Sequence, residues 1–321
     1  MKITCLLLTL LTAAFGFAPV TIPSVQRGME LHMAEQREDD NIVDNHNHHN
    51  FIANSRRDFL SSSAMLLSGM TVAATTTTFS PLPAQAASEK VLVLGETGFV
   101  GSQVISALQA QGVSVISTSR DGRLGTEALD FTNEKDIQKK VKELSQGCTA
   151  VISCIGSIGT PNDEIVNAGT GYAAAGAKEA GVDRFVYISV APEVKEFAKD
   201  IDFLKGYMAG KTYSQDAIVS KFQQYTLIEP TFIYGGDEFK VNPPRVASFY
   251  GNFVEGVLSS GPLRALTNVA PEGFIKIALE PPVPVEAVAN AAVAGALAKT
   301  GSKVAVLDTY DKIKETAGLL I

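Results

Sequence analysis

Histidine is scarce in this sequence, and its distribution excludes several kinds of active site. The 321-residue chain has four histidines, all before residue 50 (His32, His46, His48 and His49). Because residues 50–321 contain no histidine, they cannot form a Ser-His-Asp hydrolase site, a Cys-His protease site or a zinc or iron site with histidine ligands. The run NHNHHN, residues 45–50, leaves a metal-binding segment as an alternative to a polar part of a leader. In the folded part we expect no metal site.

Cysteine and basic residues are also few. Three cysteines (Cys5, Cys148 and Cys154) do not make a disulfide scaffold. Cys148 and Cys154 flank a predicted strand that separates their Cα atoms by about 20 Å, whereas a disulfide requires less than about 7 Å, so we expect two free thiols. The net charge of -7 and the lack of a basic stripe exclude nucleic acid as a partner.

Before residue 87, three sorting signals follow one another. Residues 1–16 read as a secretory signal peptide, residues 17–54 as a disordered transit-like segment, and residues 55–86 as a twin-arginine-type thylakoid signal. The stretch AFGFAP, residues 14–19, resembles the targeting motif of algae with complex plastids. We expect a location in such a plastid, in the thylakoid lumen, with the stroma or the thylakoid surface as the alternative. An uncleaved anchor at residues 64–74 is the other interpretation of the third signal.

After residue 87, apolar strands alternate with amphipathic helices. This order predicts an α/β fold with a doubly wound parallel Rossmann sheet and a small C-terminal helical substrate or cap region. In the ninety or so residues after the sixth strand we expect mainly two helices and a strand. Up to that point, strands are predicted at residues 90–94, 113–117, 151–154, 185–189 and 225–229, with a further short strand that ends at 129–131, and helices at 98–111, 134–144, 165–180 and 205–222.

The stretch GETGFVG, residues 95–101, joins the first predicted strand to the first helix. Gly95 permits a tight turn, Gly98 lets the backbone approach a pyrophosphate, and Gly101 allows the helix to pack closely. The helix N-terminus adds free N–H groups and a partial positive charge. We therefore assign residues 87–235 to a domain that binds NAD(P), and residues 236–321 to a cap that completes the same domain.

The end of the second strand favours NADP(H), with NAD(H) still possible. NAD-binding relatives of this fold place an acidic residue there for the ribose 2′-OH, but this chain has Ser119 followed by Arg120. A guanidinium pairs with a 2′-phosphate through a bidentate fork, and Arg123 could add to it. Asp121 is the counterargument, because it would favour NAD if the acidic position were displaced by one or two residues.

Together these motifs resemble the extended and atypical branches of the short-chain dehydrogenase/reductase superfamily, which are similar to NAD-dependent epimerase/dehydratase proteins. The matching stretches are GETGFVG, VNAGTGYAAAGAKEAGVDRFVYIS (166–189), EPTFIYG (229–235, with Glu229 where the family has Arg) and PPVPVEAVANAAVAGAL (281–297). The resemblance implies cofactor contacts at Gly95, Thr97, Gly98, Phe99, Val100, Gly101, Ser119, Arg120, Asp130, Phe131, Cys154, Ile155, Gly156, Lys211 and Pro230.

Within the superfamily, the likeness is greatest to plastid and mitochondrial atypical members, including the Rossmann-type accessory subunit of respiratory complex I. This resemblance implies a place near quinones, lipid or a membrane complex. We therefore expect a small apolar substrate, and a membrane complex or lipid surface as a possible partner. The apolar residues Phe249, Phe253, Val257 and Leu258 are expected either to pack on the core or to line a pocket for an apolar ligand.

The family's catalytic set is only partly present. Tyr207 and Lys211 have the Y-x-x-x-K spacing, which places them on one helix face, where the Lys charge favours the phenolate. Tyr213 is a lesser candidate. Ser189 is the nearest match to the third member, because Val190 and Ala191 have no hydroxyl at the positions where the family usually has one.

Two hypotheses follow. In the first, the protein is an NADP(H)-dependent oxidoreductase that uses Tyr207 as acid/base and Lys211 as a ribose clamp on an apolar quinone- or isoprenoid-like carbonyl. In the second, it is a non-catalytic assembly factor or accessory subunit of a thylakoid complex that keeps a bound NADP for stability. The incomplete Ser-Tyr-Lys set leaves both open, with the enzyme favoured.

Overall fold

The computed structural model describes residues 89–199, 201–236, 248–269 and 274–320. The sorting signals expected in the first 86 residues lie outside the described residues. Residues 87–321 pack as one compact unit. Among the described residues, no helix is long and apolar enough to cross a membrane.

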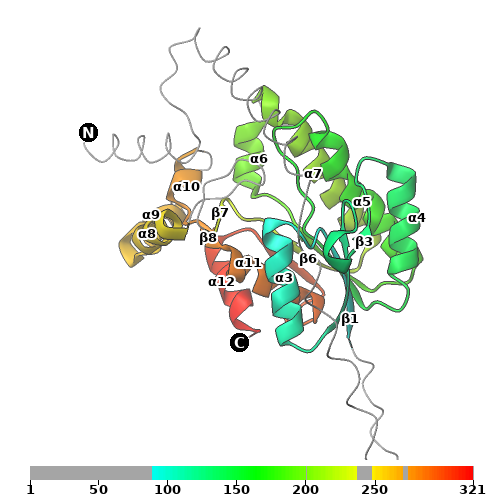
Figure 1. Cartoon of the computed structure of the whole chain (residues 1–321). Coiled ribbons are helices and arrows are strands. Elements are labelled where there is room, and N and C mark those ends of the chain that lie inside the picture. Colours follow the sequence, from blue (N-terminus) through cyan, green and yellow to red (C-terminus); the bar gives the residue numbers. More distant parts are fainter. Residues whose placement is uncertain (1–88, 200, 237–247, 270–273, 321) are drawn as a thin grey trace, which may run out of the picture. The chain divides into compact units, whose positions relative to one another are not determined.

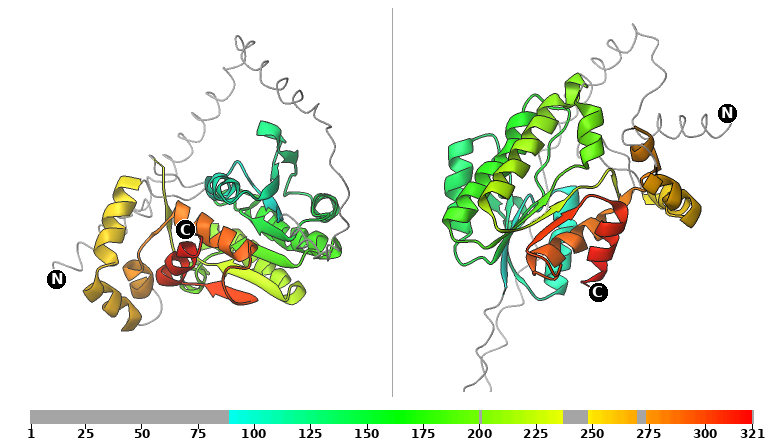
Figure 2. Two further views of the ribbon diagram at one scale, coloured as in Figure 1. Left: turned by 90° about the horizontal axis from the view of Figure 1, so that it is seen from below. Right: turned by 180° about the vertical axis from the view of Figure 1, so that it is seen from behind.

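Seven parallel strands form the central sheet (Figures 1 and 2). Their order is β3-β2-β1-β4-β5-β6-β9, so the direction of winding reverses between β1 and β4. This is the doubly wound Rossmann-like fold that the sequence predicts. The strands are β1 (Lys90–Leu94), β2 (Ser114–Ser119), β3 (Glu127–Ala128), β4 (Ala150–Ser153), β5 (Arg184–Ile188), β6 (Gln224–Ile228) and β9 (Val304–Leu307), and a separate parallel pair joins β7 (Ile233–Tyr234) to β8 (Val283–Pro284).

Helices cover both faces of the sheet, as parallel strands with crossover connections require (Figures 1 and 2). One face is covered by α3 (Phe99–Ala110), α11 (Val285–Ala296) and α12 (Tyr310–Gly318), the other by α4 (Glu134–Leu144), α5 (Asp163–Glu179) and α7 (Lys205–Lys221). The short α6 (Pro192–Ala198) follows β5. The cap contains α8 (Ser248–Leu258), α9 (Gly261–Val269) and α10 (Phe274–Leu279).

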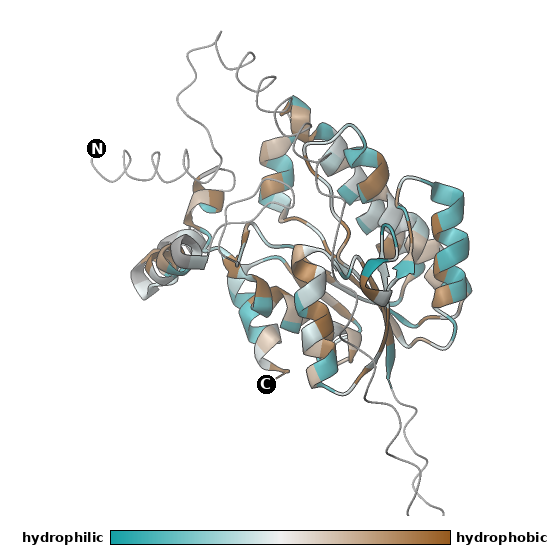
Figure 3. Cartoon of the chain, viewed as in Figure 1, coloured by the Kyte–Doolittle hydropathy of each residue, from teal (hydrophilic) through white to brown (hydrophobic). Residues whose placement is uncertain are grey.

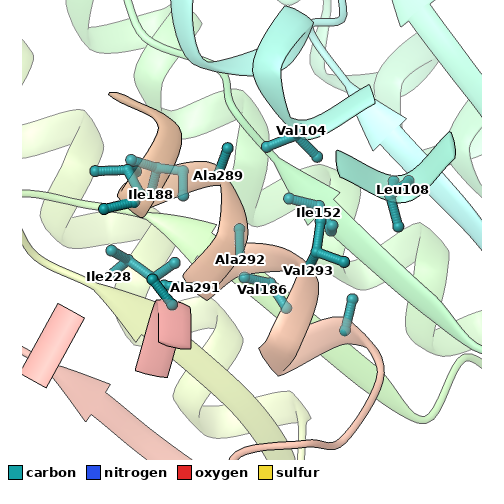
Figure 4. Close-up of a cluster of buried hydrophobic side chains, with 14 of the residues drawn as sticks. Val104, Leu108, Ile152, Val186, Ile188, Ile228, Ala289, Ala291, Ala292 and Val293 are labelled. Carbon is teal, nitrogen blue, oxygen red and sulfur yellow. The ribbon is translucent and has the colours of Figure 1, made fainter. Parts of the chain in front are cut away.

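On the first face, α11 lies against the middle of the sheet (Figure 4). Its alanines and Val293 meet Ile152 and Val186 of the strands, and Val104 of α3 closes the same cluster. Small side chains allow this close approach. At Gly295, an added Cβ would lie 2.6 Å from Thr226 Oγ1. The alanine-rich sequence of α11 is therefore explained by burial on nearly all sides.

On the second face, α4 buries Ile137 and Val141 and turns its charged residues outward (Figure 3). At both helix contacts on this face, α4 with α5 and α5 with α7, a glycine takes the place of a larger residue and lets the backbones approach closely. A Cβ at Gly210 of α7 would lie 2.5 Å from Glu164 O. This contact fixes the depth of α7, and with it the positions of Tyr207 and Lys211.

The third strand ends earlier than predicted. It spans Glu127–Ala128 and so stops before Leu129–Phe131, where its end was expected, although Leu129 N still donates to Ser119 O at 2.8 Å. Asp130 then turns the chain, because its Oδ1 accepts a hydrogen bond from Thr132 N at 3.0 Å. An aspartate turn that begins the approach to α4 therefore ends the strand early.

The region after β6 also differs from expectation. Its described residues form α8, α9, α10, α11 and α12 together with three short strands, more elements than the two helices and one strand predicted. Gly261 begins one short helix, and Pro281 and Pro282 follow the end of another, so the apolar pattern is divided. Phe253 is 65% exposed and Val257 is 45% exposed, so neither packs on the core. Leu258 is half-buried, and the side chain of Phe249 lies outside the described residues.

Candidate functional site

The residues predicted to contact a cofactor gather where the strands end. They follow the carboxyl ends of β1, β2, β3, β4 and β6, around the reversal between β1 and β4. A crevice of this kind is the usual ligand site of open α/β sheets. In chain order they are Gly95, Thr97 and Gly98 in the first turn, Phe99, Val100 and Gly101 in α3, Ser119 and Arg120 after β2, Asp130 and Phe131 after β3, Cys154, Ile155 and Gly156 after β4, and Pro230 after β6.

The glycine turn is held in a conformation that larger residues would not adopt. Gly95 has φ +88°, in the left-handed region, and its N–H and that of Glu96 both donate to Thr118 O. A Cβ at Gly101 would lie 2.0 Å from Gly95 O, so the first turn of α3 touches the backbone of the loop. The N-cap residue Gly98 is exposed and provides no side-chain cap, which leaves the helix N-terminus open to an anion.

The end of β2 holds Ser119 below the surface and leaves Arg120 exposed. Ser119 Oγ lies 2.6 Å from Thr126 Oγ1 and 3.3 Å from Asp121 Oδ1. Arg123 Nε lies 3.5 Å from the same Asp121 oxygen, and both side chains are more than half exposed. Such a surface pair is weak. Arg120 and Asp121 therefore both stand where a ribose or its phosphate would lie.

Lys211 of α7 is the most unusual charged group in the site. It is 3% exposed, and Nζ donates to Ile155 O at 3.0 Å and to Ile188 O at 2.9 Å. The ammonium also lies over the rings of Tyr187 (4.8 Å) and Tyr207 (5.8 Å). It forms no ion pair with a described carboxylate, and burial lowers the pKa of Lys211 to about 7. Two of its three N–H groups are committed, which leaves one for a ligand.

Tyr207 lies one helical turn before Lys211 and packs in a small apolar cluster. Its neighbours there include Val190, Val194 and Met208. Burial raises the pKa of the Tyr207 phenol, and the nearby Asp163 carboxylate adds to the shift. The phenol is therefore protonated at neutral pH, which is the form that donates a proton.

The loop after β4 is fixed around Asp163 by buried hydrogen bonds. Asp163 Oδ1 accepts from Ser157 Oγ at 2.9 Å and from Thr160 Oγ1 at 2.6 Å. Asn167 Nδ2 donates to Ser157 O at 2.6 Å. These contacts set the path of the chain past Gly156, where a Cβ would lie 3.6 Å from Lys211 Nζ.

The hydroxyl of Ser189 is already committed. Ser189 Oγ donates to Gln215 Oε1 at 2.9 Å, and Lys195 Nζ donates to the same oxygen at 2.5 Å. Lys195 Nζ also lies 3.3 Å from Glu229 Oε1. Glu229 is 2% exposed, and burial raises the pKa of its carboxyl group against the opposing effect of Lys195.

The sequence analysis missed Lys195 and Gln215. Gln215 follows Tyr207 by eight residues and Lys211 by four, so helical spacing could have placed all three on one face of α7. Lys195 offered no comparable signal, because its position depends on how α6 turns after β5. The substitution of Glu229 for the family's Arg was visible, but its buried partner was not.

Two predicted residues lie elsewhere. The ring of Phe131 is 5% exposed and packs in the core, where a Cβ at Gly169 would lie 2.6 Å from its Cδ1. Tyr213, the lesser catalytic candidate, is 45% exposed and pairs with the Tyr172 ring at 5.4 Å. Cys148 and Cys154 are free thiols, as expected. Among the described residues, no group of three or more His, Cys, Asp or Glu side chains could hold a metal ion.

Comparisons with known proteins agree with this geometry. Residues 95–247 match a protein family described as NAD(P)H-binding. A chloroplastic Arabidopsis thaliana protein of uncharacterized function is 33% identical over 163 residues, which are 47% of this chain and 53% of the relative. The chain thus spans about half the length of the curated relative it matches.

Solved structures with a similar arrangement include two enzymes of low sequence identity. WbmH of Bordetella bronchiseptica, determined with NAD+, has a TM-score of 0.43 at 17% identity, over 65% of this chain and 72% of that one. A dTDP-4-dehydrorhamnose reductase from Clostridium acetobutylicum has a TM-score of 0.44 at 18% identity, over 68% and 73%. Residues 95–247 are therefore similar to an NAD(P)H-binding family, in the part of the chain whose strands have a Rossmann-like order.

Proposed function

We propose that this protein is an NADP(H)-dependent oxidoreductase of the plastid that acts on a small apolar carbonyl compound. The observation that supports this most directly is Lys211. A buried ammonium that pairs with no carboxylate of the described residues lies at the carboxyl ends of β4 and β5, one turn from a protonated Tyr207. An ammonium in such a place is costly unless a ligand completes its hydrogen bonds.

The residues present fit a dinucleotide. The open N-terminus of α3, the left-handed Gly95 and the contact made by Gly101 leave backbone N–H groups and no side chain where a pyrophosphate would bind. The remaining N–H of Lys211 would hold the ribose of the nicotinamide half. When bound, the reduced cofactor supplies a hydride. Tyr207 would supply the proton to the carbonyl oxygen.

We infer a preference for NADP(H) over NAD(H) from the position of Arg120. It is exposed directly after β2, and it forms no ion pair with another described residue. Arg120 is therefore available for a 2′-phosphate, which it would bind through a bidentate fork. Asp121 keeps NAD(H) as the alternative.

The surroundings of Tyr207 suggest an apolar substrate such as a quinone- or isoprenoid-like carbonyl. Tyr207 packs in the same apolar cluster as Val190, Val194 and Leu204. This apolar cluster replaces the exposed Phe253 and Val257 as the place where such a ligand would lie. An apolar site also favours hydride transfer by excluding water from the reacting atoms.

The plastid location rests on the leader and on the relative. The relative from Arabidopsis thaliana is described as chloroplastic. The three sorting signals expected in residues 1–86 extend this proposal to the thylakoid, in the lumen or on a membrane surface, where a membrane complex or lipid would be the partner.

One observation favours the alternative, a non-catalytic accessory or assembly subunit that binds NADP. The Ser189 hydroxyl is used by Gln215, and Val190 and Ala191 offer none. If no other donor reaches the substrate oxygen, the site binds the cofactor without efficient turnover.

One experiment separates these functions. Bound NADPH is followed by fluorescence while quinones and apolar ketones are offered to the wild type and to Tyr207→Phe. We expect oxidation that depends on Tyr207, with NADPH affinity little changed by the substitution. Tight NADPH binding without oxidation of any compound would instead support the accessory subunit.

A further inference from the structure

A second lysine, Lys195, lies beside the candidate catalytic residues. It stands on α6, which follows β5, and its Nζ reaches the carboxyl ends of both β5 and β6 through Gln215 and Glu229. The backbone keeps these ends together, because Ala191 N donates to Pro230 O at 3.2 Å. Pro230 is itself one of the predicted cofactor contacts, so Lys195 belongs to the same end of the crevice.

The hydroxyl that a reductase of this kind would use is not available here. A serine hydroxyl has one donor proton, and Ser189 gives it to Gln215 Oε1 at 2.9 Å. Toward any other group Ser189 acts only as an acceptor. The next two residues, Val190 and Ala191, are buried and apolar. A carbonyl oxygen in this site therefore needs a different second donor beside Tyr207.

Lys195 could supply this second hydrogen-bond donor. Its ammonium has three N–H groups, and two are directed to Gln215 Oε1 and Glu229 Oε1. The Lys195 side chain is 19% exposed, whereas its partner Glu229 is 2% exposed. The buried carboxylate thus stabilises the charge of the ammonium, and one of the three N–H groups is directed to neither Gln215 nor Glu229.

We propose that the Lys195 ammonium, held by Glu229 and Gln215, donates a hydrogen bond to the substrate's carbonyl oxygen in the place of the missing hydroxyl. This rests on the proposed oxidoreductase function. Lys195 loses no proton in the step. The carbonyl carbon receives the hydride with its electron pair from the reduced nicotinamide, which becomes oxidised, and the oxygen receives the proton of Tyr207. Lys195 stabilises the negative charge that develops on that oxygen.

The test compares two variants that differ only in this donor. Lys195→Met alone would leave Glu229 buried without a partner and could unfold the protein. We therefore compare Glu229→Gln with the double variant Lys195→Met/Glu229→Gln. The expected result is a kcat for NADPH oxidation lower by roughly 10²–10³ in the double variant than in Glu229→Gln. The NADPH dissociation constant, measured by fluorescence, should agree within about threefold between the two.

The matched control is Lys199→Met, which removes an exposed lysine just after the same helix and should leave kcat unchanged. If the double variant and Glu229→Gln have the same kcat while Tyr207→Phe is inactive, Lys195 is not the donor and the oxidoreductase function stands. If the wild type oxidises NADPH with none of the carbonyl compounds that are offered, both proposals fail together. A loss of NADPH affinity equal to the loss of kcat would also overturn the assignment, because it would show a role in cofactor binding.

Discussion

The two ends of the candidate site are formed by different groups, backbone at one end and side chains at the other. At the α3 end, the site is formed by backbone, since the glycine turn carries no side chains at Gly95, Gly98 and Gly101 and the N-terminus of α3 has no side-chain cap. At the β5–β6 end, long side chains from three separate elements meet, with Lys195 from α6, Gln215 from α7 and Glu229 after β6. The α3 end would bind an anion through the geometry of its backbone, whereas the β5–β6 end brings charged and polar side chains together.

This difference determines how each end responds to change. The glycine turn has no room for added atoms, so even one methyl group displaces backbone. The β5–β6 end with Lys195, hereafter the lysine end, depends instead on charges that burial has removed from water. Substitutions at the α3 end should therefore disturb packing, whereas substitutions at the β5–β6 end should change the pH dependence of stability.

The largest effect is expected from Gly101→Ala. Its Cβ would lie 2.0 Å from Gly95 O, a backbone atom that cannot move aside without moving the turn. We expect the free energy of unfolding to fall by about 3 kcal/mol, and NADPH affinity to fall at least about tenfold. Denaturant titration and fluorescence binding measure the two.

The control for this substitution is Gly256→Ala, also within a helix. A Cβ there meets nothing within 4 Å. Because alanine has the higher helix propensity, this variant should be unchanged or more stable by up to about 1 kcal/mol. Equal stabilities for the two alanine variants would contradict the close contact between α3 and the turn.

Lys211→Met should produce the next largest change in the free energy of unfolding, and this change should depend on pH. The pKa of Lys211 is lowered from 10.5 to about 7 by burial, so between these values the unfolded chain binds more protons than the folded one. Stability of the cofactor-free protein due to this group therefore rises with pH from about 7 toward 9, by up to about 1.4 kcal/mol per pH unit. Below pH 7 the full cost of charging is present.

The measurement is the difference in unfolding free energy between wild type and Lys211→Met at pH 6, 7, 8 and 9. Tyrosines with raised pKa values contribute equally to both proteins and cancel. Lys221→Met, which removes an exposed lysine at the end of the same helix, should run parallel to the wild type. A parallel curve for Lys211→Met as well would show that the ammonium is not desolvated.

The comparison of the two ends also shows what the sequence could predict. The glycine turn was predicted correctly in position, because spacing along one strand and one helix determines it. The helix Glu134–Leu144 was predicted to the residue, since its charged and apolar residues alternate with helical period. The parallel, doubly wound sheet was predicted from the alternation of strands and helices.

The lysine end could not be predicted in the same way. Contacts such as Lys195 with Glu229 join residues 34 positions apart, and they depend on the depth at which α6 and α7 pack. The end of the third strand was predicted too late, because Leu129 and Phe131 have strand-like residue types although the chain turns at Asp130. Of the two alternatives for Phe253, packing on the core is wrong, since its side chain is 65% exposed. Local pattern cannot reveal any of these.

The smallest predicted effect concerns the cofactor phosphate. If Arg120 binds the 2′-phosphate, Arg120→Ala should weaken NADP binding by about 1.5–3 kcal/mol, roughly 10- to 100-fold, and leave NAD binding nearly unchanged. Calorimetric titration of both nucleotides measures the ratio. Arg123→Ala is the matched control, because Arg123 pairs with Asp121 at 3.5 Å with both side chains largely in solvent. Removing it should change the ratio by less than about threefold. If Arg120→Ala leaves the ratio of the two affinities as in the wild type, then Asp121, 3.3 Å from Ser119 Oγ, is the group that selects the ribose, and the preference belongs to NAD.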